Sequence, residues 1–217
     1  MFKREIQSLK FNGLKLFLVF ALVLFAIHFS LFTVSHAAHP LVTDDTGTQG
    51  KGKFQIEVNS EFTFDKETAD GVTTKETGGE VATILSYGIT DNTDVVLGLP
   101  YQWFKVREDG DVVKKEDGIS DMSLEMKWRF YEHEGLSLAL KPGITLPTGD
   151  EDKGLGTGRM TYGMFFITTK EIEPWAFHIN LGYTRNENKA DERKDIWHAS
   201  LAGELEVVKD IKVVANV

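Results

Sequence analysis

The stretch KFQIEVNSEFTF, residues 53–64, alternates apolar and polar side chains along almost its whole length. The apolar positions are Phe54, Ile56, Val58, Phe62 and Phe64. The positions between them hold Gln55, Glu57, Asn59, Glu61 and Thr63. Because successive side chains of a β-strand point to opposite faces, this pattern predicts a strand with one apolar and one polar face.

The same period of two recurs along the rest of the chain. Further apolar rows fall within residues 81–89, 95–103, 122–130, 136–146, 160–166, 175–183, 197–207 and 211–217. No convincing helical period follows residue 38, so we expect an all-β protein of about nine strands. Strands of about 10–12 residues are long for a soluble protein but suit a tilted crossing of a bilayer. Pro100 and Pro142 fall inside two of them, and we expect β-bulges there because proline donates no ladder hydrogen bond.

The predicted connections alternate in length. The long ones lie near residues 65–78, 107–117, 147–158 and 186–195, and the short ones near 90–93, 131–135, 170–174 and 208–210. Long loops at one end and short turns at the other are typical of outer-membrane barrels. The predicted fold is therefore an antiparallel up-and-down transmembrane β-barrel. Bacterial single-chain barrels have an even strand number, so we expect the sequence to stop within a barrel of 10–12 strands.

The N-terminus has the order of a secretory signal peptide. Four cations precede an apolar run, and the small residues Ser35 and Ala37 follow it, so we expect cleavage after Ala37. The alternative is an uncleaved anchor over residues 16–34. Export would leave a barrel domain, residues 38–217, in the cell outer membrane. Loss of residues 1–37 changes the net charge from −9 to −12, which argues against nucleic acid as a partner.

Aromatic residues fall near the ends of the predicted strands, all of them on the apolar rows. We expect them to form girdles at the two membrane interfaces, in contact with outer-membrane lipids. The expected girdle residues are Tyr87, Trp103, Trp128, Tyr162, Trp175, Tyr183 and Trp197. The alternative is a soluble sandwich with these side chains in its core.

The polar faces of the strands are expected to line the lumen. The candidate lining residues are Glu57, Glu61, Glu125, Lys127, Arg129, Lys141, Arg159, His178, His198, Glu204 and Glu206. Acidic residues on the first and eighth strands would face basic residues on the fourth to sixth, giving a transverse field across a pore. A set of salt bridges that plugs a narrow barrel is an equal alternative. A turn centred on His133 would place Glu125 opposite Lys141 as a cross-strand ion pair.

No cofactor, metal or catalytic site is predicted. His178 and His198 should point inward at different levels and make hydrogen bonds rather than bind a metal. The acidic run at residues 150–152 could hold a cation but is more simply a solvated loop. No helix follows the glycines at 154–158, so they form no phosphate-binding loop and are expected to let the loop fold back over the pore mouth. No Ser/His/Asp set has a fixed geometry, so we do not expect an enzyme.

From Gly79 onward the chain resembles the outer-membrane transporters named for the meta-pathway of phenol degradation. The most specific matches are LKPGITLPTGD at residues 140–150 and GLGTG at 154–158. Weaker matches are YGITDN at 87–92, LGLP at 97–100, GISD at 118–121 with KWR at 127–129, and NLGY at 180–183. The resemblance implies a porin-like barrel with a transport role and brings no catalytic residues.

These observations lead to a first hypothesis for function: an outer-membrane channel or transporter that passes small solutes passively, hydrophobic or aromatic ones among them. A non-conducting barrel with a structural or adhesive role is the second hypothesis. A soluble periplasmic lipid-binding barrel is the third. It would need a greasy lumen and a polar exterior. The solute and the oligomeric state are not specified by the sequence.

Overall fold

The computed structural model describes residues 43–189, 192–209 and 211–217. The expected signal peptide, residues 1–37, lies outside the described residues. Within them, no helix has the length and apolar character needed to cross a bilayer. All the strands belong to one compact unit, His39–Val217.

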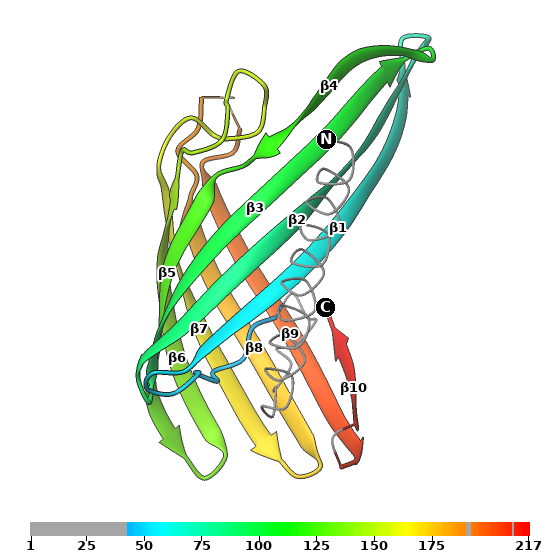
Figure 1. The fold of residues 1–217 in the computed structure, drawn as a ribbon. Coiled ribbons are helices and arrows are strands. Elements are labelled where there is room, and N and C mark those ends of the chain that lie inside the picture. Colours follow the sequence, from blue (N-terminus) through cyan, green and yellow to red (C-terminus); the bar gives the residue numbers. More distant parts are fainter. Residues whose placement is uncertain (1–42, 190–191, 210) are drawn as a thin grey trace, which may run out of the picture. The chain divides into compact units, whose positions relative to one another are not determined.

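One antiparallel sheet contains all the strands of the described residues (Figure 1). They are β1 (Phe54–Ala69), β2 (Val72–Thr90), β3 (Thr93–Glu108), β4 (Asp111–Ile119), β5 (Met122–His133), β6 (Leu136–Leu146), β7 (Thr161–Ile172), β8 (Trp175–Arg185), β9 (Asp195–Val208) and β10 (Ile211–Asn216). Consecutive strands are neighbours except that β3 pairs with both β4 and β5. The sheet curls into a half-barrel, with β1 and β10 at its edges. The all-β, up-and-down architecture predicted from the sequence is confirmed.

Two of the expected long loops are strands instead, and this is why the described residues contain ten strands rather than nine. Residues 65–78 and 107–117 extend β1, β2 and β3 and add β4. Two-residue turns join them, with φ of 52° at Asp70, 85° at Gly71, 48° at Asp109 and 101° at Gly110. Two successive positive φ angles define the tight turns that match the twist of a hairpin, and Asp-Gly is a preferred pair for them. The loop prediction for these segments was wrong.

The connections between β1 and β2, β3 and β4, β6 and β7, and β8 and β9 lie at one end of the sheet (Figure 1). The short turns between β2 and β3, β5 and β6, and β7 and β8 lie at the other end. Beyond Gly98, β3 leaves β5 and pairs with β4 from Tyr101 onward. A four-stranded extension, which we call the arm, therefore consists of residues 60–69 of β1, 72–81 of β2, 101–108 of β3 and the whole of β4. It carries the hairpin turns at Asp70–Gly71 and Asp109–Gly110.

The prolines do not cause the expected bulges. Pro100 sits where β3 changes neighbours, so no partner on that side needs its missing N–H, and its carbonyl accepts a bond of 3.0 Å from the Ser120 amide. Pro142 pairs in register with Met164. The nearest register shift lies instead at Arg129–Tyr131 on β5.

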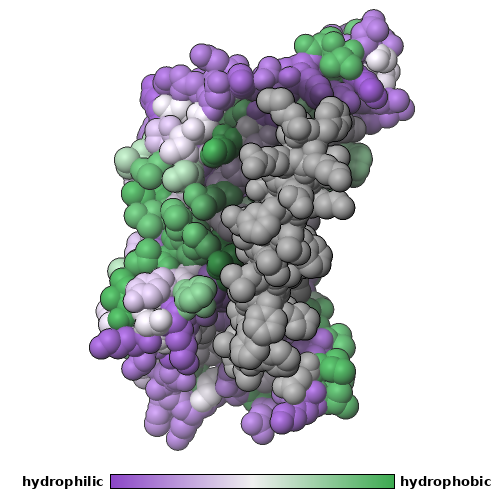
Figure 2. Space-filling model, in the orientation of Figure 1, coloured by the Kyte–Doolittle hydropathy of each residue, from purple (hydrophilic) through white to green (hydrophobic). Residues whose placement is uncertain are grey.

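The two faces of the sheet differ as the sequence predicts. Large apolar side chains of alternate positions are exposed on the convex face, from Phe54 to Val213. Polar side chains such as Asp94, Lys127, His178 and Asn180 are buried on the concave face, each less than one tenth exposed. Figure 2 shows hydrophobic residues gathered at mid-height between hydrophilic ends. Soluble proteins rarely expose an apolar face of this extent.

Candidate lumen network

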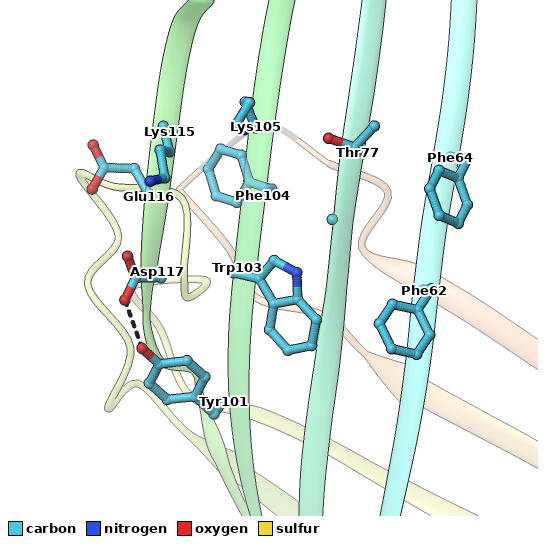
Figure 3. Close-up of a pocket in the computed structure, with 11 residues that line it drawn as sticks. Phe62, Phe64, Thr77, Tyr101, Trp103, Phe104, Lys105, Lys115, Glu116 and Asp117 are labelled. Atoms are coloured by element: carbon cyan, nitrogen blue, oxygen red, sulfur yellow. Dashed lines mark hydrogen bonds between the residues drawn. The ribbon is translucent and has the colours of Figure 1, made fainter.

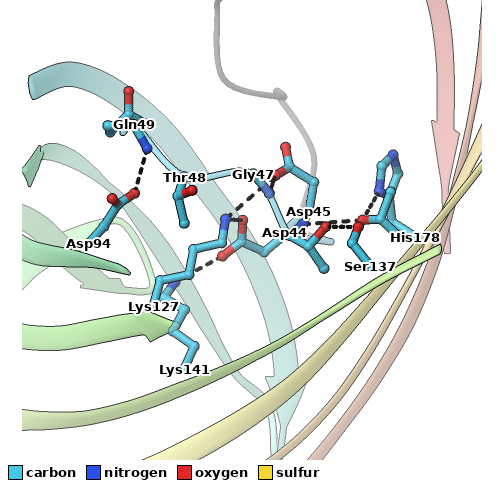
Figure 4. A network of polar contacts seen from close by, with 12 residues as sticks. Asp44, Asp45, Gly47, Thr48, Gln49, Asp94, Lys127, Ser137, Lys141 and His178 are labelled. Carbon is cyan, nitrogen blue, oxygen red and sulfur yellow. Dashed lines mark hydrogen bonds and ion pairs between the residues drawn. The ribbon is translucent and has the colours of Figure 1, made fainter. Parts of the chain in front are cut away.

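A segment without regular structure crosses the concave face of the sheet (Figure 4). Residues 43–53, which we call the strap, run from β7 and β8 past β6 and β5 to β3 and the end of β2. Thr43 and Thr46 are almost completely buried there. These residues have no regular apolar period in the sequence, and the strap was not predicted.

Asp44 of the strap bridges two lysines of neighbouring strands. Its Oδ1 accepts a hydrogen bond of 2.9 Å from Lys127 Nζ on β5, and its Oδ2 one of 3.2 Å from Lys141 Nζ on β6. Asp45 lies 3.5 Å from Lys127, and Glu125 lies 3.1 Å from Lys141. Charge-assisted bonds of this kind compensate two ammonium groups for the water they lose on burial.

Side chains of β6, β7 and β8 hold this end of the strap. Asn180 Oδ1 accepts from the Asp44 amide at 2.6 Å, and Asn180 Nδ2 donates to the Asp44 carbonyl at 2.8 Å. Thr169 Oγ1 accepts from the Thr46 amide at 3.1 Å, and the Thr46 and Ser137 hydroxyls lie 2.5 Å apart. The backbone amides of Asp44 and Thr46 are thus matched by partners on the sheet, whereas the buried Thr43 hydroxyl has no hydrogen-bond partner among the described residues.

The other end of the strap joins β2 and β3. Asp94 Oδ2 accepts from the Gln49 amide at 2.9 Å, and Asp91 Oδ1 accepts from the Lys51 amide at 3.1 Å. Gly88 exchanges backbone bonds with the strap, and a side chain there would place its Cβ 2.0 Å from the Gly50 carbonyl oxygen. Glycine at position 88 is therefore required for the close approach of the two backbones.

The environment of Asp44 lowers the pKa of its carboxyl group. Burial acts to raise this pKa, but the positive charges of Lys127 and Lys141 and the hydrogen bond from Lys127 outweigh it. Asp44 is therefore ionised when the strap is seated. Three carboxylates form ion pairs with the two lysines: Asp44 and Asp45 belong to the strap, and Glu125 belongs to the sheet.

The structure brings some expected lumen residues together and separates others. Glu125, Lys127 and Lys141 meet in one cluster, and the predicted Glu125–Lys141 ion pair is present. Arg129 instead pairs with Glu132 at 3.2 Å. Arg159 lies in the connection before β7 rather than on a strand, 4.0 Å from Glu187.

The other acidic candidates lie on β1 and β9, toward the two edges of the sheet. Glu57 is partly covered on β1, whereas Glu61 is exposed on the arm, and Glu206 is exposed on β9. Glu204 is 2% exposed, and its Oε2 accepts a bond of 3.0 Å from Lys212 Nζ on β10. The basic residues Lys127 and Lys141 thus form ion pairs mainly with carboxylates of the strap rather than with acidic residues of β1 and β9.

The two inward histidines lie at different levels, as predicted. His178 is opposite Ala202, whereas His198 is opposite Gly182. The Nδ1 atom of His178 is 2.9 Å from Thr169 Oγ1, and the Nε2 atom of His198 is 3.0 Å from Ser200 Oγ. Among the described residues, no group of three or more His, Asp or Glu side chains is arranged to hold a metal ion.

The expected girdle residues occupy both ends of the convex face, and none is buried. Those near the short turns are Tyr87, Trp128 and Trp175, and those toward the long connections are Trp103, Tyr162, Tyr183 and Trp197. Trp197 packs on Tyr183 with ring centroids 4.8 Å apart and stays 76% exposed. Trp103 does not end a strand as expected, because β3 continues to Glu108.

Trp103 also lines a pocket on the outer surface of the arm (Figure 3). Its ring lies 6.0 Å from that of Phe62 and covers Gly79, where an added Cβ would come 2.6 Å from the indole. Tyr101 borders the same pocket and donates a bond of 2.6 Å to Asp117. An open, aromatic surface with lysines at its rim is typical of a membrane interface.

The loop at residues 147–160 is tied to Asp121, just before β5, and packs against Gly118 of β4. Asp121 accepts from the Gly149 amide at 2.9 Å and from the Thr157 amide and hydroxyl at 2.7 Å each. Leu155 is 2% exposed, and a Cβ at Gly118 would lie 3.0 Å from its side chain. An ion pair between Glu151 and Lys189 joins this loop to the loop before β9.

These features define the class of the protein: a β-barrel-type sheet with an apolar outer face and a polar interior. The family model described as "Putative MetA-pathway of phenol degradation" matches residues 39–217, and the chain belongs to this family. The resemblance seen in the sequence is thereby confirmed. A comparison with curated proteins finds no match. The fold and the family description are compatible with an outer-membrane protein associated with phenol degradation.

Proposed function

We propose that the protein is an outer-membrane channel that passes small solutes passively, hydrophobic or aromatic ones among them. The observation that carries this proposal is the opposite polarity of the two faces of the sheet. Trp197 on the convex face is 76% exposed, whereas Asn180 on the concave face is polar and 2% exposed. Lipid would contact the first face, and a polar lumen would contact the second.

The strap favours a second candidate, a barrel whose lumen is closed. It crosses the concave face and holds Lys127 and Lys141 through Asp44, which is the salt-bridged arrangement expected of a plugged barrel. In that case the role would be structural or adhesive. We propose a non-catalytic role in both cases, with membrane lipids as the partner of the convex face.

Localisation is the first test of the proposal. The full chain should fractionate with the outer membrane, require detergent for extraction, and migrate differently in gels before and after heating, because a folded barrel resists the denaturing detergent. Recovery in the periplasmic fraction without detergent would instead support a soluble barrel and contradict the proposal.

Conductance in planar bilayers separates the channel from the closed barrel. Lys127→Glu and Arg129→Glu each reverse a charge on the concave face, so each should shift ion selectivity toward cations. Lys66→Glu, which makes the same charge change on the exposed arm, should leave selectivity unchanged. Full-length protein that never conducts would favour the closed barrel, and conduction with unchanged selectivity in both lumen variants would contradict a pore lined by these residues.

A further inference from the structure

The lysine pair on β5 and β6 has the features of an anion site. Lys127 and Lys141 come from adjacent strands, and one carboxylate gives an oxygen to each, at 2.9 and 3.2 Å. Lys127 is only 8% exposed. Two neighbouring ammonium groups repel each other, and an anion that bonds both of them offsets this repulsion. In this structure the carboxylate of Asp44 has that role.

The carboxylate that fills the site is not part of the sheet. Asp44 precedes β1 and is tied to the strands by side-chain contacts, chiefly those of Asn180. When the strap is seated, Asp44, Asp45 and Glu125 outnumber the two lysines. When it is displaced, the two lysines lose the carboxylate that bridges them, while Glu125, Glu57 and Asp94 remain on the sheet nearby.

We propose that Lys127 and Lys141 form a binding site for the carboxylate of a small solute, and that Asp44 occupies this site as an internal competitor when the strap is seated. The inference deepens the proposed function, on which it rests, by naming carboxylates as the solute class. The solute's carboxylate would take the place of the Asp44 side chain, with one oxygen on each lysine.

Chemical rescue tests the site directly. Asp44→Ala removes only the carboxylate and leaves a space that fits formate. Sodium formate should raise the Tm of this variant by about 2–4 °C, the shift expected for about 1 kcal/mol in a chain of this size. Formamide, which has a similar shape but no charge, should give no rise when sodium chloride keeps the ionic strength equal.

A second substitution tests whether the response to formate arises at the lysine pair. Adding Lys127→Met to Asp44→Ala should abolish the formate response, whereas adding Lys66→Met, a charge lost on the arm, should leave it intact. Equal responses to formate and formamide, or a response that survives Lys127→Met, would overturn the proposal. If Asp44→Ala folds poorly, its refolding yield in formate and in formamide gives the same comparison.

Benzoate and benzamide then probe the solute class. Titration of detergent-solubilised Asp44→Ala, followed by tryptophan fluorescence or calorimetry, should give a Kd for benzoate at least about tenfold lower than for benzamide, because charge-assisted bonds distinguish the two. Wild-type protein should bind benzoate more weakly than the variant, because Asp44 competes. Equal affinities for the two probes in the variant would refute a carboxylate site.

The benzoate titration and the conductance measurement test the carboxylate site and the channel separately. If benzoate binds as expected but bilayers containing the protein never conduct, the channel proposal fails and the carboxylate site stands. If bilayers conduct but benzoate binds Asp44→Ala no better than benzamide, the channel stands and the carboxylate site fails.

Discussion

Glu125 and Lys141 form an ion pair of 3.1 Å across β5 and β6, although Glu125 lies opposite Gly143 in the ladder. The side chain of Glu125 leans diagonally toward Lys141. A Cβ at position 143 would lie 2.8 Å from Glu125 Cγ, so the absence of a side chain there gives Glu125 its room.

Gly143→Ala is therefore expected to push Glu125 away from Lys141 and to destabilise the protein by about 1 kcal/mol, which would lower Tm by about 2–4 °C. The temperature of the heat-dependent gel shift measures this. Gly203→Ala is the control, because its new Cβ would meet Phe177 at an ordinary 3.7 Å. An equal effect of the two substitutions would contradict the role assigned to Gly143.

The lowered pKa of Asp44 predicts how the stabilisation by the strap depends on pH. A carboxyl group whose pKa is depressed by folding stabilises the folded state above its ordinary value of 3.8, and this stabilisation is lost as the pH falls through the lower, folded value. Wild type should therefore be more stable than Asp44→Asn at neutral pH, and the difference should vanish in acid. Thermal unfolding of both proteins across this range measures it. A difference that stays constant with pH would contradict the ion pairing of Asp44.

Asp121 should control the position of the loop at residues 147–160. Its carboxylate accepts bonds from the Gly149 amide and from both the amide and the hydroxyl of Thr157, so Asp121→Ala removes all three. We expect a local loss of about 1–3 kcal/mol and faster tryptic cleavage after Lys153. Asp65→Ala, an exposed change on the arm, should leave the cleavage rate unchanged. Equal cleavage of the two variants would show that other contacts hold the loop.

Gly71 should determine the turn at the tip of the first hairpin. Its φ is 85° and no atom lies within 4 Å of the position that a Cβ would take, so any cost of substitution comes from the backbone alone. Gly71→Val should cost about 1–2 kcal/mol locally and speed amide exchange of the peptide spanning Thr68 to Thr73. Gly71→Asn should be far milder, because asparagine tolerates a positive φ. Identical exchange in both variants would contradict this role of Gly71.

The faces of the strands were predictable because each depends only on the local period of two. Phe62 and Trp197 lie on the convex face and Lys127 and His178 on the concave face, as the alternation required. The Asp-Gly pairs at residues 70–71 and 109–110 also signalled hairpin turns, but the charged segments around them resembled loops. Their few apolar residues, Ala69, Val72, Val112 and Val113, do not alternate with polar ones, so the period of two could not reveal the arm.

The strap and the exact register depend on distant contacts and were not predictable in this way. Asp44 is 83 residues from Lys127 and 97 from Lys141, and nothing local distinguishes it from the other acidic residues of the chain. The Glu125–Lys141 pair was predicted from a turn centred on His133, yet the turn is Glu134–Gly135, and the shift at Arg129–Tyr131 changes the register by only one residue, so Glu125 lies opposite Gly143. The pair survives because long side chains reach diagonal as well as direct neighbours.

The fork at Gly98 makes the arm a module for engineering. Because β3 bonds to β5 below this point and to β4 above it, the ladder of the half-barrel does not pass through the hairpin tips. A short tag inserted between Asp70 and Gly71 would lengthen only the tip of one hairpin. Such a tag would display an epitope or a label away from the strands that enclose the strap, and so allow the protein to be followed without altering its interior.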